Sequence, residues 1–292
     1  MLRPLAFLAL AVSAPVSIIA ANFSGTAALD FTRQAVAFGP RPSGSEAIHK
    51  LQAYILAQLK PDGCEIIEDS FTAKTPKGDV AMKNILCKFP GPKVQGKPSN
   101  AIAITGHYDT KLFPGRRFVG ANDGGSSTGF LLELAHALAH QPRVDDVYVV
   151  LFDGEEAIGE WSATDSVYGS KHLAESWRKD GTLARLKALI NVDMIGDKSL
   201  NIKQEPNSNA RLTRLVWSTA ADLGYGAYFL DDSLAIEDDH LPFLKFGAPA
   251  LDIIDFDYPP WHEDSDTMDK LSAQSLEIVG AVVMESIHRL EH

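Results

Sequence analysis

The sequence predicts a single α/β domain, with a central twisted, mostly parallel mixed β-sheet and helices on both faces. Short apolar runs of strand length alternate with longer stretches whose apolar residues recur at helical spacing, a pattern typical of a parallel sheet covered on both sides. The chain has 292 residues, of which 45% are hydrophobic, enough for a large core. No linker, low-complexity tract or internal repeat divides it, so we expect one catalytic domain over residues 22–292.

Residues 1–21 are predicted to be a secretory signal peptide. A short basic start is followed by an apolar run at residues 5–20, and residues 19–21 form an acceptable cleavage site. A single membrane anchor is the alternative, but Pro15 and the many small residues favour a signal peptide. We therefore expect a secreted or periplasmic protein that is not stably inserted in a membrane.

The first elements of the domain are two helices and a hairpin. Residues 25–38 and 46–60 are predicted helices on either side of a Gly- and Pro-rich turn. The strand-like runs CEIIEDSF and NILCKF are joined through turn residues at 75–78. A hairpin would bring Cys64 and Cys87 close to opposite one another. They are either a disulfide, which an oxidising compartment permits, or two reduced core residues.

Four later apolar runs end in polar residues. The runs at 101–106, 147–152, 188–192 and 250–254 precede His107, Asp109, Asp153, Glu155, Glu156, Asp193, Trp261 and His262. In an open α/β sheet, reactive groups lie just beyond the carboxyl ends of such strands, so we expect these side chains at the mouth of one site.

The segment GANDGGSSTG lies between the first two of these runs and holds Asp123 in a Gly-rich turn. Residues 126–128 offer side chains that could cap the helix predicted to follow. Further helices are predicted at 211–222 and 272–290.

Two histidines and several carboxylates at corresponding strand ends predict a metal site. Each motif alone is common for structural reasons, since an Asp in a Gly-rich turn often only closes that turn. Together they supply the N and O donors of a hydrolytic zinc site, namely His107, Asp123, Glu156, Asp193 and His262. The formal net charge of −11 argues against nucleic acid or an anionic membrane as a partner.

The broader set of motifs resembles the zinc aminopeptidase superfamily. It consists of GHYD at 106–109, GANDGG at 120–125, the Glu155-Glu156 pair, Asp193, and His262 followed by Asp266-Thr267. Longer strings are similar to the glutaminyl cyclases, and the resemblance runs from about residue 38 to the carboxyl terminus. These strings are FDGEEAIGEWSATDSVYGSKHLA at 152–174, DDHLPFL at 238–244, and Trp261-His262.

The resemblance to glutaminyl cyclases implies a role for each matching residue. Asp123, Glu156 and His262 would bind one zinc ion, and Glu155 would shuttle a proton. Asp193 and Asp238 would form a hydrogen-bonded carboxylate pair beside the site. The implied substrate pocket and supporting positions are Trp161, Trp261 and Glu237, with His107, Asp239 and His240 as supporting residues or ligands of a second metal. Glu237 stands where the family has Gln, and Gly106 and Thr128 replace the cysteine pair of animal cyclases.

The implied reaction is the cyclisation of an N-terminal glutamine of a peptide or protein to pyroglutamate, with release of ammonia, by a monomeric enzyme. The alternative is a secreted di-zinc aminopeptidase, in which Glu155 activates a metal-bridging water and His107 and Asp193 help to bind a second zinc. One divalent ion cannot neutralise all the carboxylates of the site, so either a second metal binds or some carboxyls share protons. A catalytically inert binding domain would have lost ligands or Glu155, and this chain has lost none.

Overall fold

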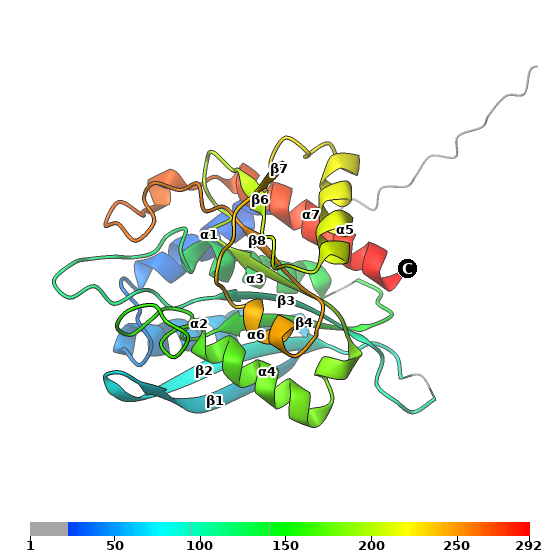
Figure 1. Cartoon of the computed structure of the whole chain (residues 1–292), viewed down its shortest axis with the longest axis horizontal. Helices are drawn as coiled ribbons and strands as arrows, with labels where there is room; N and C mark the ends of the chain where they lie inside the picture. The colour runs from blue at the N-terminus through cyan, green and yellow to red at the C-terminus, as the bar shows by residue number, and fades with distance from the viewer. Residues whose placement is uncertain (1–22, 94, 140) are drawn as a thin grey trace, which may run out of the picture.

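The predicted α/β class is confirmed in the computed structural model, which describes residues 23–93, 95–139 and 141–292. The signal peptide predicted at residues 1–21 lies outside the described residues. The main sheet has six strands in the order β1-β2-β4-β3-β5-β8 (Figure 1). Its strands are β1 (Glu65–Thr75), β2 (Gly78–Phe89), β3 (Ala101–His107), β4 (Asp146–Phe152), β5 (Leu186–Asp193) and β8 (Ala250–Ile254).

The sheet is mixed, with its parallel part on the side of β8. Strands β4, β3, β5 and β8 run parallel to their neighbours, whereas the β1–β2 hairpin pairs antiparallel with β4 through β2. A separate two-stranded parallel sheet consists of β6 (Ile202–Gln204) and β7 (Phe229–Ser233), which the sequence pattern did not predict. Because β4, β3, β5 and β8 are parallel, their carboxyl ends meet at one edge, as expected for an α/β site.

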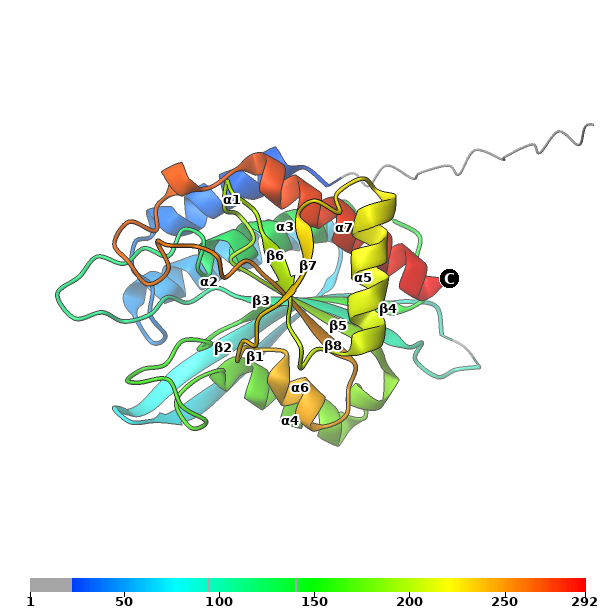
Figure 2. The ribbon, with the colours of Figure 1, turned by 45° about the horizontal axis from the view of Figure 1, so that its top comes forward.

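Helices cover both faces of the main sheet (Figure 2). One face carries α1 (Gly25–Ala37), α2 (Glu46–Leu59), α3 (Gly125–Leu138), α5 (Ala210–Asp222) and α7 (Ala273–Glu291). The other carries α4 (Tyr168–Asp180) and the short α6 (Leu241–Lys245). Among the described residues, no helix has the length and apolar character needed to cross a membrane.

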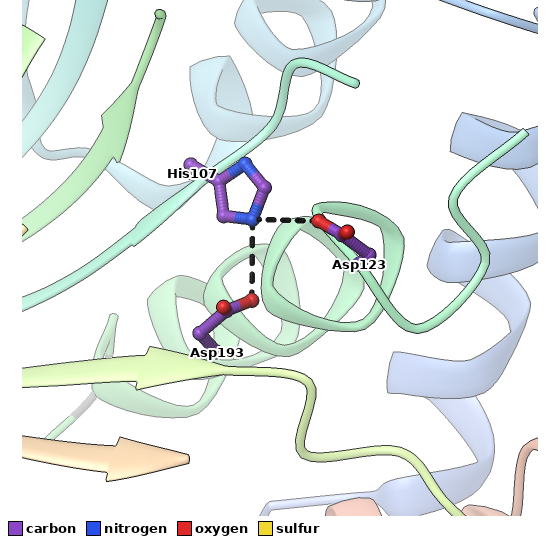
Figure 3. A group of neighbouring side chains, drawn as sticks. All are labelled: His107, Asp123 and Asp193. Atoms are coloured by element: carbon purple, nitrogen blue, oxygen red, sulfur yellow. Dashed lines mark hydrogen bonds and ion pairs between the residues drawn. The ribbon is translucent and has the colours of Figure 1, made fainter. Parts of the chain in front are cut away.

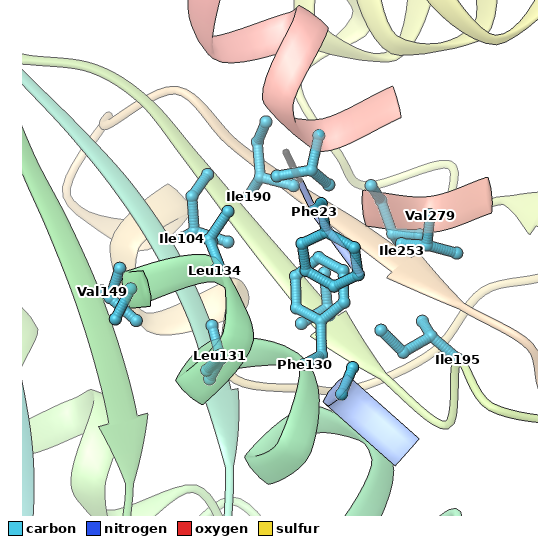
Figure 4. Close-up of a cluster of buried hydrophobic side chains, with 14 of the residues drawn as sticks. Phe23, Ile104, Phe130, Leu131, Leu134, Val149, Ile190, Ile195, Ile253 and Val279 are labelled. Carbon is cyan, nitrogen blue, oxygen red and sulfur yellow. The ribbon is translucent and has the colours of Figure 1, made fainter. Parts of the chain in front are cut away.

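The larger core fills the space between the sheet and the five-helix layer (Figure 4). Ile104, Val149 and Ile190 come from neighbouring strands and pack against Leu131 and Leu134 of α3. Strand residues of opposite parity, such as Val150 and Leu189, face α4 and α6 in the smaller core. This burial on both faces explains why most residues of the parallel strands are apolar.

The two cysteines form a disulfide. Cys64 immediately precedes β1 and is bonded to Cys87 on β2, with a Cα–Cα distance of 5.5 Å. Of the two alternatives left open by the sequence, the structure thus has the oxidised one. The disulfide joins the ends of the hairpin strands that lie far from the connecting turn at residues 76–77.

The beginning of α3 differs from the predicted capping arrangement. The helix starts at Gly125, and its N-cap residue is Gly124, which has a left-handed φ of 71° and no capping side chain. Ser126 and Thr128 instead lie inside the first turn, where their hydroxyls donate to the carbonyls of Asn122 and Gly124. The hydroxyls therefore stabilise the turn that carries Asp123.

Candidate active site

Two strand ends and one helix start bring His107, Asp193 and Asp123 together (Figure 3). His107 is the last residue of β3 and Asp193 the last residue of β5, while Asp123 lies just before α3. Nε2 of His107 is 3.1 Å from Oδ1 of Asp193 and 3.3 Å from Oδ1 of Asp123. All three side chains are buried, so this group is enclosed at the end of the sheet.

A second group shares Asp123 with the first. Nε2 of His262 is 3.4 Å from Oδ2 of Asp123 and 3.2 Å from Oε1 of Glu156. One ligand atom from each of Asp123, Glu156 and His262 lies within 4.8 Å of the others, and the same is true of the first group. The two oxygens of Asp123 therefore face two different histidines.

The second group has donor chemistry that fits zinc. Its potential ligand atoms are one imidazole nitrogen and carboxylate oxygens, which are common zinc donors. Among the described residues, Oδ2 of Asp123 is buried and accepts no hydrogen bond. Since buried polar atoms are normally paired, an oxygen left without a donor beside an imidazole suits a metal ligand.

The backbone at His262 is held in an uncommon conformation. Its φ of 57° is left-handed, which costs energy in a non-glycine residue and persists only where surrounding contacts enforce it. The imidazole stacks on Trp261 at 4.2 Å between ring centroids, and the rings of Phe113 and Phe118 meet it edge-on. Arg116 also donates to the carbonyl of His262 at 3.0 Å. These contacts explain how one exposed loop presents a fixed imidazole.

Asp109 organises the neighbouring acids, a role that the sequence did not reveal although the residue belongs to the GHYD motif. Its carboxylate accepts hydrogen bonds from the amides of Glu155 at 3.2 Å and Glu156 at 3.3 Å. It also lies 3.4 Å from Nδ1 of His107. One carboxylate therefore connects the segments after β3 and β4.

Burial and crowding alter the proton affinities of the acids. Burial raises the pKa of Glu155 well above its ordinary value, and Glu156 and Asp238 add to this effect although His107 opposes it. Burial and the charge of Asp123 raise the pKa of Glu156 to about 7. Burial also opposes the ionisation of Asp123, but His107 and His262 outweigh it and lower its pKa. Asp123 is therefore the carboxylate of the set best suited to stay ionised.

Asp193 and Asp238 are neighbours, but each has its own partners. The carboxylate of Asp193 contacts His107 and accepts the amide of Met194 at 2.7 Å. Oδ2 of Asp238 accepts from Nδ2 of Asn191 at 2.9 Å. Burial, together with the charge of Asp193, raises the pKa of Asp238 to about 6. A shared proton between them stays a prediction.

Asp239 and His240 form hydrogen bonds with residues outside the two candidate metal groups. Oδ1 of Asp239 accepts from the hydroxyl of Ser170, and Nε2 of His240 lies 3.0 Å from Oε2 of Glu205. Neither belongs to the groups of potential ligands found among the described residues. Their contacts therefore favour the supporting role over the second-metal role.

Asp153 does not lie at the mouth of the site, contrary to the sequence-based prediction. It is fully buried, with hydrogen bonds from Ser43 Oγ at 2.6 Å and from the Lys83 amide at 2.9 Å. Strand β4 ends at Phe152, and the chain turns at Gly154, which has a φ of 72°. Asp153 before this turn and Glu155 after it therefore do not lie in the same surroundings. Asp153 ties the amino-terminal segment and β2 together.

A pocket of about 920 Å³ opens above the candidate metal groups. Asp123, Glu155, Glu156, Asp193 and His262 line its base. Trp161, Trp261, Glu237 and Asp238 also line it. Sequence reasoning missed further apolar lining residues because they lie on irregular loops without a periodic pattern: Leu112, Phe113, Pro114, Leu234, Ile236 and Phe256.

Known proteins are similar to this chain in sequence and in fold. Residues 84–287 match the model of peptidase family M28. The chain is 30% identical over 254 residues to a glutaminyl-peptide cyclotransferase of Drosophila melanogaster, covering 78% of this chain and 70% of the fly protein. A glutaminyl cyclase of an Acidobacteriales bacterium has 43% identity and a TM-score of 0.89, covering 96% of this chain and 98% of that chain. A zinc-dependent exopeptidase of Parabacteroides distasonis has 26% identity and a TM-score of 0.80, covering 92% and 99%.

Proposed function

This chain belongs to peptidase family M28 and to the glutaminyl-peptide cyclotransferases, and from that premise we propose that it cyclises N-terminal glutamine. The substrates are peptides or proteins that begin with Gln, and the products are the pyroglutamyl chain and ammonia. One observation carries the assignment: buried Glu155 lies beside the Asp123, Glu156 and His262 group, at the base of a pocket lined by two tryptophans.

In this proposal Asp123, Glu156 and His262 hold one zinc ion. Oδ2 of Asp123, which accepts no hydrogen bond, and the imidazole of His262 3.4 Å from it support this choice. A zinc ion held by these residues would supply Lewis-acid chemistry for the side-chain amide of the substrate glutamine. Among the zinc ligands, His262 is held by the aromatic rings around it, which fix its ligand nitrogen before the metal arrives.

Glu155 is the proposed proton carrier. The α-amine of the substrate attacks its own side-chain amide carbon, so a new C–N bond closes the five-membered lactam ring and the bond to the amide nitrogen breaks. Glu155 takes one proton from the attacking amine and delivers it to the leaving nitrogen, which departs as ammonia. A raised pKa suits this exchange, because the carboxyl must both accept and return the proton.

The walls of the pocket orient the substrate glutamine. Both reacting groups belong to one glutamine residue, so holding that side chain in a curled pose brings amine and amide carbon together. Trp161 and Trp261 provide flat apolar surfaces for this pose and limit access of water. Glu237 lies beside Trp161 and near the mouth, where the chain following the substrate glutamine would leave the pocket.

A second candidate function is that of a di-zinc aminopeptidase. The observation favouring it is the complete His107, Asp123 and Asp193 group, which shares Asp123 with the first zinc site. His107 is bonded to Asp193 as His262 is to Glu156, so an ion would have to separate either pair. Against the second ion, both ring nitrogens of His107 have carboxylate partners, whereas the His262 group includes Oδ2 of Asp123, a buried oxygen that accepts no hydrogen bond. We therefore propose a single zinc in a monomeric enzyme.

The proposed location is outside the cytoplasm. The predicted signal peptide at residues 1–21 would leave a mature domain of residues 22–292. The disulfide between Cys64 and Cys87 supports this, since such bonds persist mainly in oxidising compartments. Amino-terminal sequencing of protein from the producing cell would test the cleavage site.

Mass spectrometry of two peptides tests the reaction. We expect purified protein to remove one ammonia from a Gln-initiated peptide and to leave a matched Leu-initiated peptide intact. Removal of the first residue from either peptide would establish the aminopeptidase instead. Elemental analysis of the same sample is expected to give one zinc per chain, and two tightly bound ions would contradict the one-zinc proposal.

A further inference from the structure

A fully buried arginine lies behind the candidate metal groups. Arg41 belongs to the Gly- and Pro-rich turn before α2 and is among the largest fully buried side chains of the described residues. The backbone of Arg41 both donates a hydrogen bond to Thr110, in the segment after β3, and accepts one from it. The Arg41 amide donates to Oγ1 of Thr110 at 2.9 Å, and the Thr110 amide donates to the carbonyl of Arg41 at 3.4 Å.

The guanidinium of Arg41 donates only to backbone carbonyls in the part of the chain that the structure describes. Nε donates to Tyr108 at 2.8 Å, a residue between His107 and Asp109. Nη1 donates to Val119 at 2.5 Å. Nη2 donates to Gly120 at 2.9 Å and also lies 3.5 Å from the carbonyl of Asp123. One side chain thus connects the segment that carries His107 with the segment that carries Asp123.

The segment from Gly120 to Asp123 is also held from the opposite side. The carboxylate of Asp266 accepts the amide of Asn122 at 2.8 Å and the amide of Asp123 at 3.2 Å. The turn is tight, because a Cβ at Gly120 would lie 2.4 Å from the carbonyl oxygen of Asp123. Its N–H groups are therefore bound by Asp266 and its carbonyls by Arg41.

Burial of the Arg41 guanidinium is energetically unfavourable, which indicates that Arg41 does more than fill space in the core. Burying a guanidinium is unfavourable unless hydrogen bonds and nearby opposite charges compensate it. Burial lowers the pKa of Arg41 to about 10, and the negative charges of Asp123, Asp109 and Asp266 oppose this shift. The guanidinium also donates hydrogen bonds to backbone carbonyls. All three acids border the metal groups, so the cation stabilises the acidic cluster from behind without occupying a ligand position.

We infer that Arg41 is a positioning residue for the metal site, which sets the distance between the His107 and Asp123 segments and thereby aims both oxygens of Asp123. This inference rests on the zinc site of the proposed function. It requires the forked guanidinium itself, because an ammonium group cannot reach carbonyls on two segments in a fixed geometry. Residues that orient metal ligands in this way typically change metal affinity about 10–100-fold when replaced.

Zinc affinity, measured by competition with a chelator, tests the inference. Arg41→Lys keeps the charge and loses the fork, and Arg41→Met loses both. We expect each to raise the zinc dissociation constant about 10–100-fold. The matched control is Arg143→Lys, since Arg143 donates to the backbone carbonyls of Leu138 and Gln141 beyond the far end of α3. This control should bind zinc like the wild type.

Cobalt absorption spectra give a second readout. With Co²⁺ in place of zinc, Arg41→Lys should shift the visible bands, which report ligand geometry, while Arg143→Lys should not. Unchanged zinc affinity and unchanged spectra in Arg41→Lys would overturn the inference, even if its melting temperature falls. Failure of both Arg41 variants to fold at any temperature, with or without zinc, would assign Arg41 to fold stability and also overturn it. A wild type without zinc affinity would instead refute the proposed metal site.

Discussion

Nε1 of Trp161 donates a 3.0 Å hydrogen bond to Oε2 of Glu237 at the mouth of the pocket. The two residues are 76 positions apart and lie in different loops, so the bond fixes the orientation of an exposed indole ring between them. Glu237, which stands where the resemblance leads us to expect Gln, therefore has a hydrogen-bonding role in this chain. Glu237 thereby acts on the substrate pocket through Trp161.

Loss of this bond should weaken substrate binding. We expect Glu237→Leu to raise KM for a Gln peptide about five-fold with little change in kcat, because a hydrogen bond contributes about 1 kcal/mol. Glu237→Gln keeps an acceptor oxygen and should stay near the wild-type KM. Steady-state kinetics of the three proteins check this. An equal rise in KM for both variants would show that the charge of Glu237 matters, and not the bond.

Substitution of Gln for Glu155 and for Glu156 should have different effects, the first on kcat and the second on zinc binding. Glu155→Gln should lower kcat about 10²–10⁴-fold while zinc content stays at the wild-type level, because only proton transfer is removed. Glu156→Gln should lose bound zinc, since a ligand oxygen is replaced. Kinetics with elemental analysis separate the two outcomes. Zinc loss in Glu155→Gln would exclude a pure proton-transfer role.

The buried pair of Glu205 and His240 should make the free energy of unfolding depend on pH in the acidic range. Burial opposes the ionisation of Glu205, but hydrogen bonds from His240, the Asn207 amide and Ser208 outweigh it and lower its pKa to about 2. A depressed carboxyl pKa stabilises the fold above the ordinary value of 4.5, and this contribution is lost as pH falls toward about 2.

Glu205→Gln should therefore lower the free energy of unfolding at pH 7 by on the order of 2 kcal/mol. The difference from wild type should shrink between about pH 4.5 and pH 2, the window set by the pKa of Glu205. Urea denaturation across pH measures it, with exposed Glu277→Gln as the control. A difference that stays constant over this window would contradict the charge-based explanation.

Removal of the disulfide should reduce stability without removing activity. Cys64 and Cys87 are 23 residues apart, and closing a loop of this length in the unfolded chain is worth about 3 kcal/mol. The double substitution of both cysteines by Ser should lower the free energy of unfolding by up to that amount. Neither cysteine lines the pocket, so kcat should be unchanged where the variant is folded. Parallel loss of kcat in the folded variant would show that the hairpin shapes the site.

The strands of the parallel sheet and the residues at their carboxyl ends could be predicted from the sequence, because each depends on one dominant physical signal. The buried parallel strands are short and mostly apolar, which made β8 recognisable at its observed bounds. The potential ligands followed from strand ends that meet at one edge, and His107, Asp123, Glu156, Asp193 and His262 do lie together there. These features depend on local pattern and on the general geometry of α/β sheets.

Features set by three-dimensional partners were harder to predict. The burial of Arg41 depends on carbonyls from residues 108–123, which no periodicity reveals. Asp153 turns inward because Ser43 and the Lys83 amide bind it, although the motif places it beside Glu155. The α3 start uses the left-handed Gly124 in place of a hydroxyl cap because the preceding turn is shaped around Asp123.

The order of the chain decides when the ligands of the proposed zinc site are all present. His262 and Asp266 follow the last strand of the sheet, so the third proposed ligand and the acceptor for the Asp123 amide emerge late in synthesis. A nascent chain that ends before His262 carries Asp123 and Glu156 but lacks the third ligand of the proposed set. In the proposed site, zinc binding therefore requires the chain through His262. Any truncation before this residue, by proteolysis or an early stop codon, is expected to leave a protein that cannot bind zinc there.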